Sequence, residues 1–254
     1  MNANLTRALK FDPSGGLTIF RRELASYFNS PIAYIFIIVF LVLTAGLYMT
    51  PFFLQGQADM RGFFGNLPLF LIFFIPAISM RLWAEDKRSG TFELLMTLPL
   101  RAADVMLGKY FAALVFYAIA LAGTLPIPIM LGSLGNPDGG AILGGYLASL
   151  LLGALYLSVG IFVSGLVRDQ ITAFILGMIA CFFLYLVGLD PVAATVDGWI
   201  GGFGSFMQGA FGLLGHYESM QRGVVLLADL AYFITLSVVF LLLNAYWLEG
   251  RKHG

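Results

Sequence analysis

The sequence predicts an all-α membrane protein with six transmembrane helices. Charged residues make up 11% of the 254 residues, against about 25% in a typical soluble protein, and apolar residues make up 59%. A water-soluble chain of this length needs more polar side chains to cover its surface. The formal net charge of zero provides no field that would attract nucleic acid. Cys181 is the single cysteine, which excludes an internal disulfide and a cysteine-built metal cluster.

Six stretches of the chain are free of Asp, Glu, Lys and Arg and are long enough to cross a bilayer, which takes about 20 apolar residues. These stretches are 24–58, 62–80, 110–137, 139–167, 170–189 and 230–248. We expect the transmembrane helices at 32–50, 63–81, 110–131, 141–166, 171–189 and 228–248. Together they form a single transmembrane domain over 1–254, with a flexible N-terminus at 1–16. Pro76, Pro126 and Pro128 each remove a backbone donor and should bend their helices.

The positions of the basic residues predict the topology. With six helices and both termini in the cytoplasm, twelve of the 14 Lys and Arg residues lie on the cytoplasmic side, and only Arg61 and Arg222 lie outside. This asymmetry follows the positive-inside rule. A seventh uncharged stretch, 198–217, contains seven glycines, and as a span it would move the C-terminal basic pair to the wrong side. We therefore expect 190–228 to form short external helices that are re-entrant or interfacial.

An amphipathic helix is expected at 17–30, before the first span. Leu17, Phe20, Leu24 and Phe28 share one face at helical spacing, and the arginines and the glutamate between them lie mostly elsewhere. An apolar face flanked by arginines is typical of a helix that lies in the membrane interface and contacts lipid headgroups. We therefore expect membrane lipid to be a partner of this helix.

The predicted spans contain no ionisable side chain near their centres. Ion-coupled transporters and proton pumps use such groups at membrane depth. An intramembrane hydrolase needs a metal-ligand set or an acid–base pair. Both classes are therefore disfavoured. A path lined by Phe, Leu, Gly and Ser suits an amphiphile, such as a lipid, a glycolipid or an apolar peptide, better than a small ion.

Small residues recur at helical spacing in the fourth and fifth spans. They are Gly145, Ser149, Gly153, Gly160 and Ser164 in the fourth, and Ala173, Gly177 and Cys181 in the fifth. Small side chains allow two helix backbones to approach closely in lipid. The two stripes therefore predict either packing within one bundle or an interface between subunits. Cys181 fits its stripe as a small apolar residue rather than as a redox group.

The segment 81–109 holds nine residues of Asp, Glu, Lys and Arg, yet its centre is apolar. Thr91 can cap a short helix, Glu93 would lie in its first turn and Pro99 would bound it. Its apolar side chains would be Phe92, Leu94, Leu95, Met96 and Leu98. Such a helix either fills a groove on a partner protein or folds back on the bundle.

The residues of this segment resemble those of the ABC-2 class of ABC transporter permeases. The matching series is Met80-Arg81, Glu85-Asp86, Gly90-Thr91, Glu93, Leu94-Leu95, Pro99 and Gly108-Lys109. In that class the series follows the second transmembrane helix and forms a cytoplasmic coupling helix that docks on the ATPase subunit. The resemblance therefore implies an ATPase-coupling loop made of Glu85, Asp86, Gly90, Thr91, Phe92, Glu93, Leu94, Leu95 and Leu98.

Two further stretches extend the resemblance over nearly the whole chain. The helix at 17–30 is similar to the elbow helix that precedes the first span in this class. The stretch from His216, Tyr217 and Glu218 through Asp229 resembles most the gliding-motility-associated branch of these permeases. In the class, the segment between the fifth and sixth spans forms short external helices partly embedded in the outer leaflet.

The assembly that the resemblance implies has two permease subunits, expected as a homodimer, and two ATPase subunits in a bacterial inner membrane. The chain lacks the phosphate-binding pattern Gly-x-x-x-x-Gly-Lys-Ser/Thr, because its Gly108-Lys109 is followed by Tyr110. ATP and magnesium would therefore bind to the separate ATPase chains. We expect no catalytic, cofactor or metal site on this chain, and no nucleic acid partner.

The sequence leaves two further functions open. In the first, the chain moves no cargo and transmits force through 190–228 to a partner with a periplasmic domain. In the second, it is a membrane enzyme, for which His216 and Glu218 with the external Asp190 and Asp197 form the one plausible set. The enzyme is the weakest hypothesis, because a cluster of satisfied interfacial polar residues explains the same four side chains.

Overall fold

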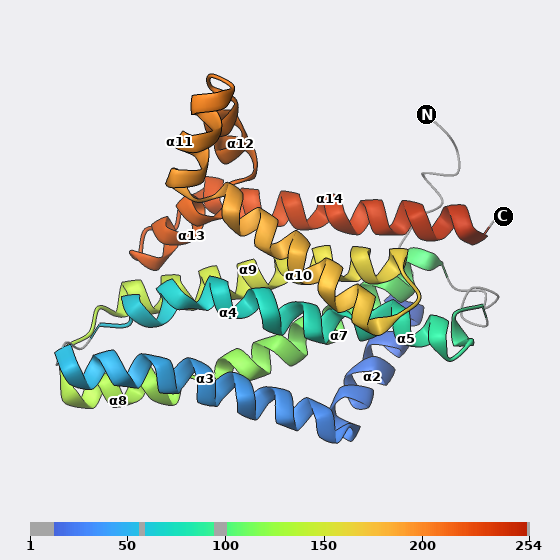
Figure 1. Ribbon diagram of the computed structural model, residues 1–254. Coiled ribbons are helices and arrows are strands. Elements are labelled where there is room, and N and C mark those ends of the chain that lie inside the picture. The colour runs from blue at the N-terminus through green and yellow to red at the C-terminus, as the bar shows by residue number, and fades with distance from the viewer. Residues whose placement is uncertain (1–12, 56–58, 94–100, 253–254) are drawn as a thin grey trace.

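The structure is a computed structural model that describes residues 13–55, 59–93 and 101–252 (Figure 1). It is 88% helical, and the described ranges contain no strand. The predicted all-α fold class is therefore confirmed. The helices in these ranges are α2 (Pro13–Asn29), α3 (Pro31–Gln55), α4 (Arg61–Ser79), α5 (Arg81–Arg88), α7 (Ala102–Ala122), α8 (Pro126–Leu134), α9 (Gly139–Leu166), α10 (Gln170–Val187), α11 (Asp190–Trp199), α12 (Phe203–Phe211), α13 (Leu213–Gln221) and α14 (Leu227–Lys252).

Six helical segments among the described residues are long and apolar enough to cross a membrane. They are Pro31–Leu54, Arg61–Arg88, Ala102–Leu134, Gly139–Leu166, Gln170–Val187 and Leu227–Gly250. The predicted number of spans is confirmed, and the protein is a multi-pass membrane protein. Several helices are longer than their predicted ranges. The clearest case is α7, which begins at Ala102 rather than at 110, because Asp104 and Lys109 are buried within the folded chain instead of ending the helix.

The N-terminal helix α2 begins at Pro13 and therefore includes residues assigned from sequence to a flexible N-terminus. It packs along α7, and the contact requires Gly108. A Cβ atom at Gly108 would lie 2.8 Å from the carbonyl oxygen of Gly16 and 3.0 Å from the Cβ of Ile19. The position of α2 in the membrane interface stays a prediction.

The helix α9 is the centre of the bundle, with contacts to α4, α7, α10, α13 and α14. Its small residues are the points of closest approach. A Cβ atom would overlap the Phe64 ring at Gly145, the Tyr117 ring at Gly153 and the Ser79 side chain at Gly160. The fourth-span stripe is thus occupied by contacts within one chain, as close packing through small residues requires.

The fifth-span stripe also faces the interior of this chain. Ala173 and Cys181 are buried in α10, and a Cβ atom at Gly177 would touch the Pro76 ring of α4 at 3.4 Å. Ser149 of the fourth-span stripe is fully buried: its hydroxyl donates to the Gly145 carbonyl at 2.7 Å, and its carbonyl accepts from the Tyr117 hydroxyl at 2.9 Å. These residues therefore hold the bundle together.

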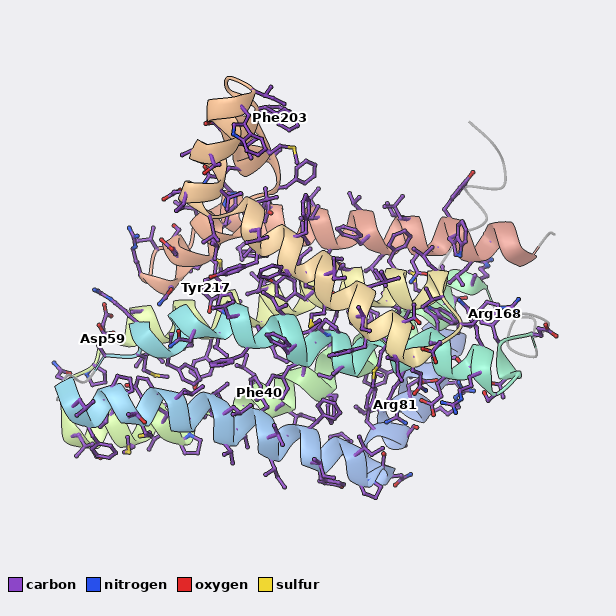
Figure 2. The ribbon with its side chains drawn as sticks, in the orientation of Figure 1. Phe40, Asp59, Arg81, Arg168, Phe203 and Tyr217 are labelled. Carbon is purple, nitrogen blue, oxygen red and sulfur yellow. The ribbon has the colours of Figure 1, made fainter. Side chains whose placement is uncertain are left out.

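The described ends of the chain lie at the same end of the bundle (Figure 1). Arg81 and Arg168 lie at this end, and Asp59 lies at the other (Figure 2). The third span is interrupted between α7 and α8, where Pro126 occupies the first helical position of α8. The missing backbone donor of proline explains why the chain restarts the helix there.

We predict that Gly153→Ala destabilises the protein by about 1–3 kcal/mol, because the added methyl group overpacks the contact with the buried Tyr117 ring. Gly46→Ala is the matched control: a Cβ atom at Gly46 in α3 meets nothing within 4 Å. Thermal unfolding of both variants in detergent, followed by fluorescence-detected size exclusion, measures the difference. Equal melting temperatures would contradict the packing role of Gly153.

Candidate functional site: a charged junction at one end of the bundle

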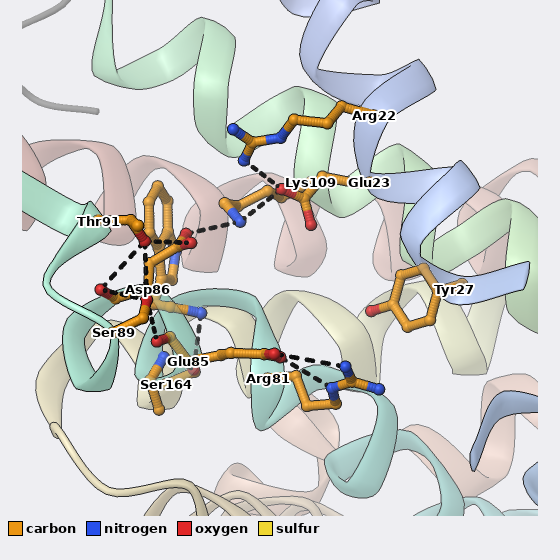
Figure 3. Close-up of polar contacts among 12 residues, drawn as sticks. Arg22, Glu23, Tyr27, Arg81, Glu85, Asp86, Ser89, Thr91, Lys109 and Ser164 are labelled. Carbon is orange, nitrogen blue, oxygen red and sulfur yellow. Dashed lines mark hydrogen bonds and ion pairs between the residues drawn. The ribbon is translucent and has the colours of Figure 1, made fainter. Parts of the chain in front are cut away.

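A cluster of ion pairs joins α2, α5 and α7 at the end of the bundle that contains the described chain ends (Figure 3). We call it the charged junction and define it by Glu23, Arg81, Glu85, Asp86 and Lys109. The cluster lies directly before the segment that resembles a coupling helix. Its geometry decides how that segment is attached to the membrane-spanning helices.

The helix α5 continues the second span past a break at Met80. At the break, the Ser164 hydroxyl of α9 enters the backbone ladder: it accepts from the N–H groups of Trp83 and Ala84 and donates to the carbonyl of Met80, each at 3.1 Å. A side chain inserted into the i→i−4 ladder is a known cause of a helix bend. Ser164 thereby fixes the start of α5 to the end of α9.

The Lys87 ammonium makes the second connection between α5 and α9. It donates to the carbonyls of Gly165 and Val167, the latter at 3.0 Å, at the C-terminus of α9. A cation at this position satisfies carbonyls that have no helical partner and interacts favourably with the helix dipole. With Ser164 and Lys87 together, α5 and the end of α9 form one mechanical unit.

Lys109 is the centre of the charged junction. Its ammonium in α7 lies 2.9 Å from a Glu23 oxygen of α2 and 2.8 Å from an Asp86 oxygen of α5. The Lys109 side chain is only 2% exposed, and its ammonium lies 5.4 Å from the centre of the Trp83 ring. A buried cation requires such compensation, since removing it from water costs several kcal/mol. One side chain therefore ties three helices together.

Asp86 extends the junction to the segment that follows α5. The Thr91 hydroxyl donates to an Asp86 carboxylate oxygen at 3.1 Å and shares a hydrogen bond with Ser89 at 2.9 Å. Gly90 between them has a φ of 74°, which a residue with a side chain rarely adopts. Residues 91–93 are helical. The Gly-Thr pair thus turns the chain and anchors the new helical residues to Asp86.

Phe92 contacts its own chain on one side. Its ring meets the Trp83 ring edge to face at 5.9 Å between centroids, and the Lys87 ammonium lies 5.4 Å from its centre. Phe92 is only partly buried by these contacts, and its docking in a groove of a partner stays a prediction. Glu93 is exposed. Leu94, Leu95 and Leu98 lie outside the described residues, and their docking stays a prediction.

The charges of the junction lower the pKa of the Glu23 carboxyl. Burial alone would raise the pKa of its carboxyl, but the Lys109 ammonium and the hydrogen bonds from Arg22 and Lys109 outweigh burial and hold the pKa below its usual value. Glu85, predicted from sequence as a coupling residue, binds Arg81 instead of Lys109, at 2.9 Å. The junction is therefore built from two separate sets of ion pairs, which α5 holds through the neighbouring residues Glu85 and Asp86.

Two buried polar groups beside the junction have no hydrogen-bond partner. They are the indole nitrogen of Trp83 and both amide atoms of Asn244 in α14, and both residues are 0% exposed. A Cβ atom on Gly165 would lie 3.2 Å from the Asn244 amide oxygen and 3.7 Å from a Trp83 ring carbon, so the two groups face the same glycine. Burying a polar group without a hydrogen-bond partner costs free energy, so these two groups lower the stability of this end of the bundle.

Sequence reasoning missed Glu23, Lys87, Trp83 and Asn244 as parts of this site, and it placed Ser164 in a packing stripe only. Lys109 was present in the Gly-Lys pair of the family series but was not assigned a role. A lysine at the start of a long apolar segment was the available signal, because an ammonium there needs a carboxylate partner.

The external residues singled out from sequence do not form one site. Tyr217 is buried and donates to the Phe64 carbonyl at 2.8 Å, which fixes α13 on α4. His216 lies 2.8 Å from Asp229 and stacks on the Tyr232 ring at 4.3 Å. Glu218 pairs with Arg222 on the surface.

The two aspartates of the enzyme hypothesis lie elsewhere. Asp190 accepts a hydrogen bond from Gln208 at 2.7 Å, and Asp197 accepts from the backbone N–H of Ser205 at 3.1 Å. Within the described ranges, no group of three His, Cys, Asp or Glu side chains could hold a metal ion. The four residues proposed for an enzyme are therefore separate structural contacts.

We predict that Lys109→Met destabilises the protein by about 3–5 kcal/mol, because it leaves the buried carboxylates of Glu23 and Asp86 without their shared cation. Adding Glu23→Gln and Asp86→Asn to Lys109→Met should recover part of the loss. Arg222→Met, at a residue 71% exposed, is the control and should be nearly neutral. Urea or thermal unfolding in detergent measures all three, and a neutral Lys109→Met would contradict the central role of this side chain.

The lowered pKa of Glu23 predicts a pH dependence. A carboxylate whose pKa is lower in the folded state stabilises the protein above its unfolded value, and this contribution is lost as the pH falls through the folded-state pKa. Glu23→Gln should therefore lower the melting temperature at pH 7, and the difference should shrink below the ordinary value of 4.5. Glu218→Gln, at an exposed residue, is the control and should change the melting temperature little at pH 7. A constant difference for Glu23→Gln from pH 7 to pH 3.5 would contradict this account.

Comparison with known proteins now defines the family. Residues 53–246 match the family described as ABC-2 family transporter protein. No curated protein shows significant similarity to the chain. The matched range covers most of the chain and includes four of the six spans in full and most of the sixth, together with Asp86, Thr91 and Lys109. The chain belongs to the ABC-2 family of transporter proteins and is a transporter membrane subunit.

Proposed function

We propose that this chain is the permease subunit of an ATP-driven exporter and that the charged junction transmits the movement of a separate ATPase to the membrane-spanning helices. Proteins of this family work with an ABC ATPase partner. The observation that carries the proposal is the position of Lys109, which links α7 to α2 and α5 directly before the segment that resembles a coupling helix.

A displacement of the coupling segment would reach the bundle through defined contacts. Thr91 holds the segment to Asp86, and Asp86 holds Lys109 of α7. Ser164 and Lys87 hold α5 to the end of α9. Packed helices joined in this way move as rigid bodies between discrete arrangements rather than deforming continuously. Closure of an ATPase dimer would thus tilt α7 and α9 together.

ATP and magnesium would bind on the partner chains. The Gly108-Lys109 pair lies inside α7, where the lysine is buried and occupied by two carboxylates, so it supports no phosphate-binding loop here. We propose two ATPase subunits and two copies of this chain as a homodimer, since two-fold symmetry is the commonest arrangement. The gathering of basic residues near α2, α5 and the start of α10 supports an inner-membrane orientation with cytoplasmic termini.

The cargo that fits best is an amphiphile, because the spans carry apolar and small residues and no central charge. A second candidate function is force transmission to a membrane-anchored partner with a periplasmic domain, as in the gliding-motility-associated branch. The observation that favours it is the pair α11 and α12, which projects sideways from the bundle (Figure 1). Trp199 and Phe206 on this pair are 85% and 67% exposed, which leaves an aromatic surface for a partner.

We predict that Leu94→Asp with Leu95→Asp abolishes co-purification of the ATPase while membrane insertion is retained, because two carboxylates would enter an apolar groove. Leu226→Asp with Leu227→Asp, an exposed pair at the opposite end of the bundle, is the matched control and should leave association intact. Quantitative pull-down from solubilised membranes measures both. Unchanged recovery of the ATPase with the first double variant would overturn the coupling role.

The two candidate functions differ in what stimulates ATP hydrolysis. For the reconstituted complex in liposomes, export predicts that an amphiphilic cargo raises the ATPase rate several-fold. Force transmission predicts stimulation by a periplasmic protein and no response to amphiphiles. Stimulation by the protein alone would decide against export.

A further inference from the structure

An open hollow lies between α2 and the start of α5. Its volume is about 570 Å³, and it is lined by Arg22, Ala25, Ser26, Asn29, Ser30 and Arg81. The lining from α2 follows helical spacing, with positions 22, 25, 26 and 29 on one face. The helix α2 therefore contributes polar side chains to the hollow, and α5 contributes the guanidinium of Arg81.

The two arginines are the charged residues of the lining, and both have donors left for a ligand. The pair with Glu23 uses one N–H donor of Arg22, at 2.7 Å. The pair with Glu85 uses Nε of Arg81 at 2.9 Å and one Nη at 3.5 Å. A guanidinium has five N–H donors. Neither glutamate lines the hollow, although both line an adjoining pocket that shares Ser26 and Arg81 with it, so each arginine lines the hollow while it is paired with a glutamate outside it.

The rest of the lining adds polar side chains. Ser26, Asn29 and Ser30 line the hollow, and Ser30 directly precedes α3. Two guanidiniums with hydroxyl and amide side chains form a donor set that suits a phosphate group.

The exposed apolar residues beside the hollow favour a membrane lipid as the source of that phosphate. Ile32 and Ile35, in the first turns of α3, are 52% and 59% exposed, and α3 is one of the six spans. The hollow thus lies where a polar surface meets an apolar one, which is where the phosphate of a membrane lipid resides with its acyl chains beside the helix. We infer that the hollow binds the phosphate group of an anionic phospholipid.

A bound phosphate would link α2 to α5 next to the charged junction. Arg22 contacts Glu23, and Glu23 contacts Lys109, so the ligand is two ion pairs from the centre of the junction. This role does not depend on ATPase coupling, because it concerns the lipid and the three helix ends alone. An experiment that contradicts lipid binding at the hollow therefore leaves the proposed permease function untested, and the two proposals can fail separately.

The test is binding of dioleoylphosphatidylglycerol to the purified full-length chain, measured by native mass spectrometry and by the rise in melting temperature. Arg22→Gln with Arg81→Gln should weaken binding at least tenfold. Arg21→Gln is the matched control, since Arg21 is the exposed neighbour on the same helix and does not line the hollow. Ser26→Leu should also weaken binding, by filling the hollow while leaving both ion pairs in place.

Three outcomes would overturn the inference. The first is equal weakening by Arg21→Gln and by the double variant, which indicates unspecific attraction to a basic surface. The second is full binding by both the double variant and Ser26→Leu. The third is equal stabilisation by inorganic phosphate at the same concentration, which assigns the site to a free anion rather than a lipid. Melting temperatures without added lipid verify that each variant is folded.

Discussion

The buried ammonium of Lys109 is the constraint on which the end of this bundle depends. A lysine that is 2% exposed needs carboxylates at contact distance, and the two that it has come from α2 and α5. Because the cation cannot be left alone in an apolar surrounding, the three helices cannot separate independently. The ion pairs of Lys109 therefore connect the three helices mechanically. They do so where the chain leaves the membrane-spanning part.

The second constraint is the close packing of α9. Its glycines bring the rings of Phe64 and Tyr117 and the side chain of Ser79 against its backbone, which leaves no room for independent movement of the neighbouring helices. Ser164 at the end of α9 then enters the backbone of the second span. A rigid centre joined to a charged end is an arrangement that can pass a displacement along the bundle.

The comparison of sequence and structure separates two kinds of prediction. The number of spans and the family were readable, because hydropathy and short motifs are local properties. The interfacial position of the N-terminal helix and the coupling helix stay predictions. The contact between Phe92 and Trp83 was not readable, because the two side chains meet only through the turn at Gly90.

The sequence by itself determined that the chain has six stretches able to cross a membrane, since this follows from composition along the chain, and its series from Met80 to Lys109 resembles that of the ABC-2 permeases. Only the tertiary structure decided which charges meet. Glu23 and Lys109 are 86 positions apart and Lys87 reaches a helix end 80 positions away. Such pairs depend on how helices pack across the bundle, a property that no local pattern encodes. The physical reason is that desolvation, not sequence proximity, chooses the partner of a buried charge.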